Sequence, residues 1–180
     1  DKLRREINMK DSYVTTGRQY KDFIKSQNPD LPEENIILEP QMRDVGPAVG
    51  LVAAILAKKF PDEAVAILWS DHFVKDVAQY KKLLVSAGSY ALAHPSQIVF
   101  MGQKARFATA NLGWINLGKM VAQDENIDTY EFAGWHYRPP LDVAKQYFAD
   151  GHHAWNPGYF VTTSSNLWEL YEKYARFKKQ

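Results

Sequence analysis

The chain alternates short apolar runs with segments whose apolar residues recur every three or four positions. Apolar runs of strand length lie at 12–17, 35–40, 64–71 and 97–103. The first three are followed by segments that are helically spaced or largely apolar, at 18–27, 46–60 and 74–94. Strands that alternate with helices predict crossover connections and a mainly parallel sheet with helices on both faces. We therefore expect an α/β fold.

The pattern changes after residue 103. Segments 112–122 and 129–138 flank the polar turn "QDENID" and have the character of strands, which predicts an antiparallel strand pair near 113–138. The remaining pattern predicts a helix, a strand and a final helix, at 139–151, 159–164 and 166–179.

Charge and cysteine content narrow the class of protein. The 22 basic and 21 acidic residues nearly cancel, so no general field attracts nucleic acid or an anionic membrane. The chain has no cysteine, which fits a reducing compartment. No apolar run approaches the roughly 18 residues that span a bilayer, and the charged start "DKLRREINMKD" lacks the apolar core of a signal peptide. We expect a cytoplasmic protein with neither nucleic acid nor membrane as a partner.

The stretch "AVAILWSDHF" ends an apolar strand on Asp71 and His72. Ligands of open parallel sheets gather at the carboxyl ends of the strands, and Mg²⁺ prefers carboxylate oxygens while it bridges to phosphates. Asp71 is therefore a candidate metal ligand. The alternative is that Asp71 caps the helix that follows and that His72 packs beside it.

The segment "EPQMRDVGP" leads from the second strand into a helix whose first turn carries Gly46 and Pro47. A helix start presents backbone amides to a ligand, and the carboxylate of Glu39 can accept hydrogen bonds from a guanine ring. The alternative is a loop that is held together by a salt bridge between Glu39 and Arg43.

Further candidates lie in the second half of the chain. Arg138, before two prolines, can bind phosphate through its guanidinium group, and it is equally a surface arginine. Trp155, Asn156 and Gly158 suit sugar hydroxyls and close approach of a ligand, or they are ordinary packing and turn residues. The adjacent His152 and His153 are expected to face solvent in a turn. No GxxxxGK[ST] or GxSxG motif is present, so P-loop and common hydrolase functions have no support.

Five segments occur in the order and spacing of one known family: "IILEPQMRDVGPAVGLVAA", "ILWSDHFV", "FMGQKA", "ANLGWINLG" and "WHYRPPLDVAKQYFADGHHAWNPGYFV". They resemble the mannose-1-phosphate guanylyltransferase family of sugar-phosphate nucleotidyltransferases. That family's pattern runs close to E-P-x-x-R-N-T-A-P-A-I, P-x-D-H, T-G-Y-G-Y-I, F-V-E-K-P and W-N-S-G-M-F. The resemblance implies a Rossmann-like nucleotidyltransferase fold across residues 1–180.

The same resemblance implies an enzyme that converts GTP and mannose 1-phosphate to GDP-mannose and pyrophosphate with Mg²⁺ as cofactor. It assigns catalysis to Asp71, also the metal ligand, and to Arg138, in place of the lysine of F-V-E-K-P. It assigns nucleotide binding to Glu39, Arg43 and Pro47. It assigns sugar-phosphate binding to Gly113, Tyr137, Asn156 and Gly158. A second copy of the chain, in a homodimer, is a further expected partner.

The chain also departs from the family pattern. Tyr137 stands in place of the glutamate of F-V-E-K-P, and Asn111 replaces the first glycine of T-G-Y-G-Y-I. The family's opening strand and its glycine-rich G-G-x-G-T-R-L-x-P segment have no counterpart in the 180 residues. We therefore expect a partial domain that is inactive by itself. The alternative function is a non-catalytic nucleotide- or nucleotide-sugar-binding module derived from that family.

Overall fold

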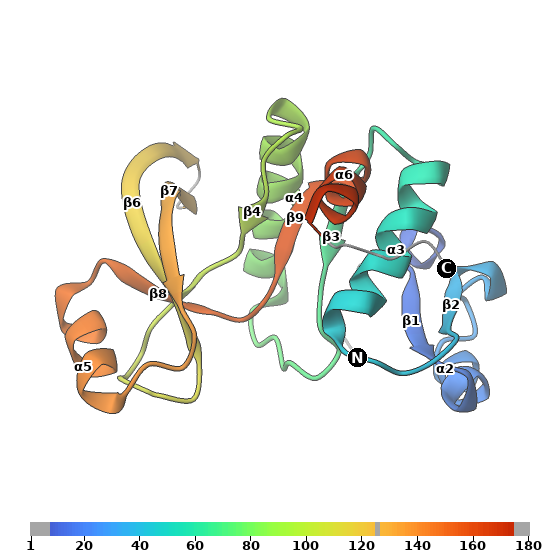
Figure 1. Ribbon diagram of the computed structural model, residues 1–180, viewed down its shortest axis with the longest axis horizontal. Helices are drawn as coiled ribbons and strands as arrows, with labels where there is room; N and C mark the ends of the chain where they lie inside the picture. Colours follow the sequence, from blue (N-terminus) through green and yellow to red (C-terminus); the bar gives the residue numbers. More distant parts are fainter. Residues whose placement is uncertain (1–7, 125–126, 175–180) are drawn as a thin grey trace. The chain divides into compact units, whose positions relative to one another are not determined.

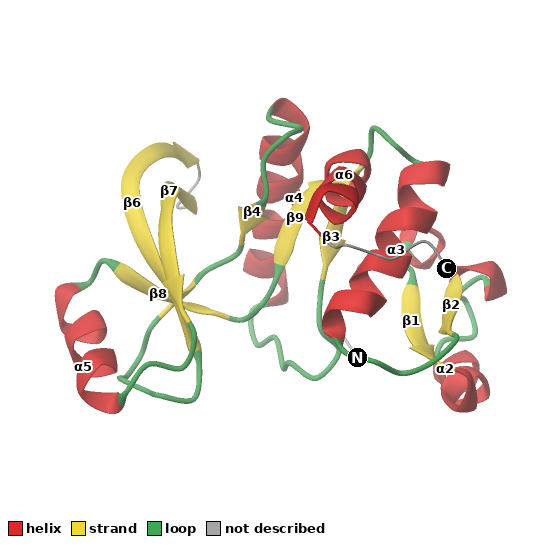
Figure 2. Cartoon of the chain, in the orientation of Figure 1, coloured by secondary structure: helices red, strands yellow, loops and turns green. Residues whose placement is uncertain are grey.

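The computed structural model describes residues 8–124 and 127–174, and the chain divides into two compact units (Figures 1 and 2). Unit 1 takes Asp1–Glu63, Phe73–Val77 and Thr163–Gln180, and unit 2 takes Ala64–His72 and Ala78–Thr162. Three parts of the sequence predictions lie outside the described residues: the start of the chain at 1–7, the middle of the polar turn at 125–126, and the end of the last helix at 175–179.

In unit 1, strand β1 (Val14–Gly17) pairs in parallel with β2 (Ile36–Glu39), with Gly17 opposite Glu39. The segment between them holds the 3₁₀ turn η2 (Arg18–Tyr20), helix α2 (Lys21–Gln27) and the turn η3 (Glu33–Asn35). A further 3₁₀ turn, η1 (Met9–Asp11), precedes β1. The helix expected at 18–27 therefore begins as 3₁₀ and becomes α-helical at Lys21.

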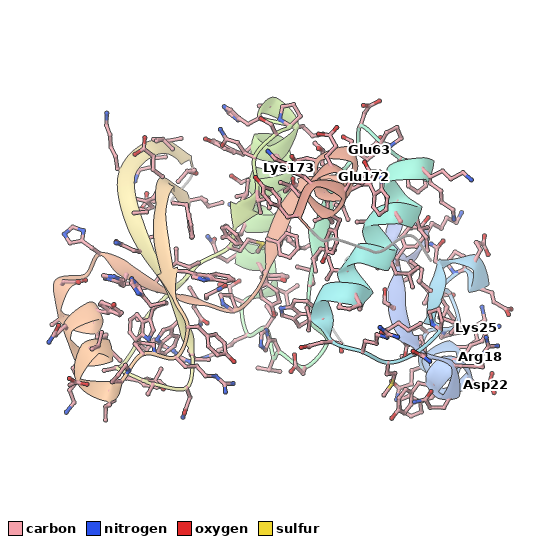
Figure 3. The ribbon with its side chains drawn as sticks, viewed as in Figure 1. Arg18, Asp22, Lys25, Glu63, Glu172 and Lys173 are labelled. Carbon is pink, nitrogen blue, oxygen red and sulfur yellow. The ribbon has the colours of Figure 1, made fainter. Side chains whose placement is uncertain are left out.

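Helices α3 (Val45–Lys59) and α6 (Ser164–Tyr174) pack against each other in unit 1. The buried side of α3 consists of small and apolar residues, and the hydroxyl of Tyr171 in α6 donates to the carbonyl of Gly46 at 2.7 Å. Arg18 of η2 and Asp22 of α2 are exposed charged residues of this unit, while Lys25 of α2 is half-buried and donates through Nζ to the Leu31 carbonyl at 2.9 Å (Figure 3). The buried face of α3 therefore consists of the small and apolar positions that the sequence pattern indicated.

Unit 2 contains a three-stranded sheet in the order β3-β9-β4, formed by β3 (Ala64–Ile67), β9 (Phe160–Thr163) and β4 (Val99–Phe100). Helix α4 (Val77–Ala93) contributes Ala87 and Ala91 to the core beside this sheet. The same core contains Met101, Tyr159 and Val161. Tyr159 therefore sits in the core at the point where the chain enters β9.

The second sheet of unit 2 has the order β5-β8-β6-β7. Its strands are β5 (Gln103–Lys104), β8 (His153–Asn156), β6 (Gly113–Asp124) and β7 (Ile127–His136), and their pairings are antiparallel. Helix α5 (Leu141–Asp150) packs Ala144 against Trp114 and Trp155 of this sheet. The antiparallel pair expected near 113–138 is confirmed as β6 and β7.

The expected mainly parallel sheet is wrong. β1 and β2 are parallel, but β4 pairs with β9 in the antiparallel direction and the four-stranded sheet is antiparallel. The strand–helix–strand unit from β3 through α4 to β4 exists, yet β9 lies between its two strands. Local periodicity predicts the strands but not which distant strand lies beside each of them. The α/β class itself is confirmed. No described helix combines the length and the apolar character needed to cross a membrane.

Candidate functional site

A small open cavity lies at the end of β2 in unit 1. Its volume is about 250 Å³, and it is lined by Glu39, Pro40, Gln41, Arg43, Pro47 and Leu51. Pockets for drug-sized ligands measure roughly 300–1,000 Å³, so this cavity has room for part of a nucleotide. All three residues expected to bind the nucleotide are brought together here.

Arg43 does not pair with Glu39 in the described part of the chain. Its Nε and Nη2 atoms donate to Oε1 of Gln41 at 3.3 and 2.9 Å. The alternative of a loop held by a salt bridge between Glu39 and Arg43 is therefore wrong. Gln41 fixes the guanidinium group, and the Glu39 carboxylate remains on the cavity wall.

The first turn of α3 forms another side of the cavity. Asp44 is the N-cap, and its Oδ1 accepts a hydrogen bond from the Val45 amide at 2.7 Å. Pro47 has no amide hydrogen, so it contributes an apolar surface to the cavity. The start of α3 therefore contributes both an apolar surface and polar backbone groups to the cavity wall.

Asp71 lies in the loop that follows β3 in unit 2. Helix α4 begins at Val77, six positions later, so Asp71 does not cap that helix. Its side chain is 82% exposed, and its nearest ionisable neighbour is His72, with Nε2 3.9 Å from Oδ1. The helix-cap alternative is wrong, and the carboxylate is accessible to a ligand.

His72 and Tyr159 lie next to residues predicted to bind ligands, and the sequence assigned a role to neither of them. The Nδ1 atom of His72 lies 2.5 Å from the Tyr159 hydroxyl, and their rings meet edge to face with centroids 5.1 Å apart. The two residues are 87 positions apart. The sequence contains one indication of this contact. His72 directly follows Asp71 in "SDHF", and Tyr159 directly follows Gly158 in "NPGYF", so each polar ring is next to a predicted binding residue.

The turn from Asn156 to Tyr159 brings two predicted sugar-site residues together. The amide nitrogen of Gly158 donates to Oδ1 of Asn156 at 2.9 Å, which leaves the NH₂ group of Asn156 to donate to a ligand oxygen. Gly158 has φ +85°, and a Cβ atom there would collide with Nε1 of Trp69. Because Trp69 and His72 both touch this turn, the Asp71 loop packs directly against it.

Gly113 lies at the same end of the four-stranded antiparallel sheet as the turn that starts at Asn156. It pairs with Asn156 across β6 and β8, and a Cβ atom added to it would lie 3.5 Å from the Asn156 Cβ. The end of β7 lies on the other side, because Trp114 pairs with His136. Unit 2 therefore collects Gly113, Asn156 and Gly158 beside the strand end that leads into Tyr137 and Arg138.

Tyr137 and Arg138 form an exposed corner after β7. Tyr137 is 76% exposed, and the Arg138 guanidinium lies over its ring at 5.3 Å from the centroid. Arg138 has φ +46°, a conformation that non-glycine residues seldom adopt and that costs roughly 1–3 kcal/mol. Two prolines follow directly and restrict the backbone at this point.

Mg²⁺ is compatible with the side chains near Asp71. Among residues 8–124 and 127–174, no three histidine, aspartate or glutamate side chains form a metal-binding group. Magnesium sites that carry nucleotides use one or two carboxylates, and water and phosphate oxygens complete the shell. One exposed carboxylate fits such a site.

Two expectations in β8 need correction. Trp155 is 3% exposed beneath Phe107 and Arg106, so its indole does not face a ligand, and its Nε1 has no hydrogen-bond partner in the described structure. The side chain of His153, expected in solvent, is only 8% exposed; its ring stacks on Tyr147 with centroids 4.0 Å apart, and its Nδ1 lies 3.0 Å from the Asp150 carboxylate. In both cases side chains packed on a face of the sheet cover the residue: Phe107 and Arg106 cover Trp155, and Tyr147 of α5 covers His153.

The chain is similar to several characterised proteins. The mannose-1-phosphate guanylyltransferase of Escherichia coli (strain K12) is 30% identical over 166 residues, which cover 89% of this chain and 34% of that protein. A crystal structure from Thermus thermophilus, described as a mannose-1-phosphate geranyltransferase, matches with a TM-score of 0.74 at 24% identity, over 89% of this chain and 44% of that one. A Helicobacter pylori mannose-6-phosphate isomerase structure matches with a TM-score of 0.76 at 17% identity, over 97% of this chain and 64% of that one.

The two solved structures share the fold of this chain. The chain spans about a third of the length of the curated relative from Escherichia coli. The family model described as nucleotidyl transferase matches residues 5–180, nearly the whole sequence. The resemblance that the motifs indicated is confirmed: the chain belongs to the nucleotidyl transferase family.

Proposed function

We propose that this chain carries the substrate-binding residues of a mannose-1-phosphate guanylyltransferase, which makes GDP-mannose and pyrophosphate from GTP and mannose 1-phosphate. A phosphate oxygen of the sugar phosphate attacks the α-phosphorus of GTP and forms the new P–O bond. The bond between the α-phosphorus and the bridging oxygen of the β-phosphate breaks, and pyrophosphate leaves. Such a transfer needs positioning and charge stabilisation more than a covalent nucleophile.

The observation that carries the proposal is that the predicted residues gather within each unit, at strand ends, with the chemistry that each substrate needs. Unit 1 presents a carboxylate, a fixed guanidinium and a proline around one cavity. Unit 2 presents an amide NH₂, two glycines and an exposed carboxylate around one turn. The names of the relatives support the same substrates.

Each side chain then has a stated role. Glu39 accepts hydrogen bonds from the N1–H and amino group of guanine, and Arg43 and Pro47 border the nucleotide. Asn156 donates to a sugar hydroxyl, while Gly113 and Gly158 allow the sugar to approach the backbone. Arg138, held over Tyr137, neutralises the phosphate of the sugar.

Asp71 would hold Mg²⁺. When bound, the ion neutralises phosphate charge and orients the triphosphate. We also propose that the protein is cytoplasmic and that it forms a homodimer.

The test measures pyrophosphate release by the full-length gene product with GTP, mannose 1-phosphate and Mg²⁺. We expect turnover in the wild type, and we expect Asp71→Asn to lower it by at least about 100-fold, because the amide has no charge to hold the metal. The matched control is Asp62→Asn, at an exposed turn in unit 1, which should leave the rate unchanged. Equal rates in the two variants would remove Asp71 from the site.

The same assay separates the enzyme from a binding module. Tyr137 in place of a glutamate favours the second function, because the corner after β7 then has no carboxylate for sugar hydroxyls. Binding of GDP-mannose measured by calorimetry, without any pyrophosphate release, would assign the chain to that second function.

A further inference from the structure

Helix α6 lies beside α3 in unit 1 (Figure 1) and forms hydrogen bonds near both of its own ends. The amides of Ser164 and Ser165 donate to carbonyls of the turn 61–63, which follows α3, at 3.0 and 3.2 Å. Further along α6, the hydroxyl of Tyr171 lies 2.7 Å from the carbonyl oxygen of Gly46, in the first turn of α3. α6 is therefore bonded both to the segment after α3 and to the start of α3.

The donor in the Tyr171 contact follows from the two atoms. A carbonyl oxygen carries no hydrogen, so the hydroxyl of Tyr171 donates and Gly46 accepts. Burial raises the pKa of Tyr171, so the hydroxyl keeps its hydrogen at neutral pH. The accepting carbonyl belongs to the peptide group that joins Gly46 to Pro47. The hydrogen bond therefore restrains the position of the proline as well.

The first turn of α3 is weak by itself. Glycine loses more conformational freedom in a helix than any other residue, and a proline disfavours the helical conformation of the residue before it, here Gly46. The hydrogen bond that closes the turn, from the Ala48 amide to the Asp44 carbonyl, is 3.3 Å long. At the other end of the helix, the Phe60 amide donates to the Leu56 carbonyl at 2.7 Å. A restraint from outside the helix therefore has a large effect on this turn.

The same turn forms part of the cavity wall. Pro47 and Leu51 are four positions apart, which places them on one face of α3, and both line the cavity together with Glu39 and Arg43. Movement of the turn shifts Pro47 relative to the loop that carries the other lining residues. The shape of the cavity therefore depends on what holds the turn in place.

We propose that Tyr171 is a positioning residue for nucleotide binding, whose hydroxyl holds the Gly46–Pro47 peptide group and thereby keeps the first turn of α3 in place as a wall of the cavity. The part that concerns the nucleotide rests on the proposed function, and the restraint of the turn does not. Tyr171 lies 125 positions from Gly46 and outside the five segments that carry the family resemblance. The motifs therefore assign it no role.

The first experiment compares hydrogen exchange in the full-length wild type and in Tyr171→Phe, which keeps the ring and removes the hydroxyl. Mass spectrometry of overlapping peptides separates the start of α3, at 45–51, from the rest of the helix. We expect the amides of 45–51 to exchange about 3-fold to 10-fold faster in Tyr171→Phe, the range that corresponds to the loss of one hydrogen bond. Tyr174→Phe is the matched control, since it removes a hydroxyl from the same helix at a ring that is 68% exposed, and it should leave these rates unchanged.

Three other amides show whether the effect is local. Those of Phe60, Ser164 and Ser165 report on the far end of α3 and on the start of α6, and their own hydrogen bonds stay intact in Tyr171→Phe. We expect them to exchange at the wild-type rate. Unchanged exchange at 45–51 overturns the proposal. Equal acceleration at 45–51 and at these three amides also overturns it, because that result indicates a general loosening of the packing between α3 and α6.

The second experiment measures the Kd of GTP with Mg²⁺, and the Kd of mannose 1-phosphate, by calorimetry on the same proteins. A cavity wall that is in place for a smaller fraction of the time weakens binding in proportion to that fraction. We expect Tyr171→Phe to raise the Kd of GTP about 3-fold or more and to leave the Kd of mannose 1-phosphate unchanged, a difference that a loss of overall stability does not produce.

The outcomes separate this proposal from the proposed function. An unchanged Kd of GTP in Tyr171→Phe overturns the nucleotide part of the proposal. A wild type that binds no GTP contradicts the proposed function instead, and the exchange rates at 45–51 then decide whether Tyr171 restrains the turn.

Discussion

Gly158 shows how much a single position contributes to unit 2. Its φ of +85° disfavours any side chain, and the Trp69 ring occupies the space of a Cβ atom. We expect Gly158→Ala to lower the free energy of unfolding by about 1–3 kcal/mol or more, from backbone strain and the clash together. Denaturant unfolding measures this loss.

Gly88 is the matched control for that substitution. It lies inside α4, and a Cβ atom there meets nothing within 4 Å. Gly88→Ala should therefore raise the free energy of unfolding by about 0.5–1 kcal/mol, because alanine loses less backbone entropy in a helix. Equal effects of the two substitutions would show that the Trp69 contact does not shape the turn.

Glu39 is expected to decide the choice of base. Glu39→Gln keeps the size of the side chain but replaces one acceptor oxygen by an NH₂ group, which opposes the N1–H of guanine. We expect the preference for GTP over ATP, as the ratio of kcat/KM values, to fall about 10-fold or more, in line with the cost of an unmatched buried hydrogen bond. Glu34→Gln, on the exposed turn η3, is the matched control, and a GTP preference that stays equal in both variants would contradict the assignment.

Helix α3 connects the apolar core of unit 1 to the cavity, and its first turn is held by the Asp44 side chain. Loss of an N-cap costs about 0.5–2 kcal/mol, so Asp44→Ala should lower the free energy of unfolding by about 1 kcal/mol. Asp44→Asn should keep most of the stability, because asparagine caps as well as aspartate. Thermal unfolding compares the stabilities of the two variants directly. An equal loss of stability in both would mean that the charge of Asp44 matters rather than its capping hydrogen bond.

Sequence patterns identified α3 well and α2 less well. The apolar residues of α3 recur on a broad face, so its predicted range of 46–60 differs from Val45–Lys59 by one residue at each end. The segment at 18–27 is short and exposed, and its first turn takes the tighter 3₁₀ form. Short segments have few internal hydrogen bonds, so their ends depend on neighbours that the local pattern does not contain.

The division into two compact units leads to a prediction for the whole molecule. From the proposed roles we expect GTP to slow hydrogen exchange in unit 1 at the amides of 41–46, beside the cavity. Mannose 1-phosphate with Mg²⁺ slows exchange in unit 2, at Gly113 and Gly158, next to the Asp71 loop. Mass spectrometry of exchanged peptides measures both effects, with α5 as the unaffected reference. Protection that spreads evenly over both units with either ligand would contradict these separate roles.

The sequence by itself determined most of the helices and strands, the hairpin of β6 and β7, and the family, while the ligand-binding residues that it indicates stay predictions. These follow from local periodicity and from short motifs, such as the run that ends on Asp71, because a motif keeps its residues within one turn or strand. Gly113, Asn156 and Gly158 are predicted from such motifs alone.

Only the tertiary structure decided the pairing partners. It placed β9 between β3 and β4, set Arg43 on Gln41, stacked His153 on Tyr147 and joined His72 to Tyr159 across 87 positions. Strand order and side-chain contacts at such separations depend on which surfaces bury the most apolar area together, a property of the whole chain that no local pattern contains.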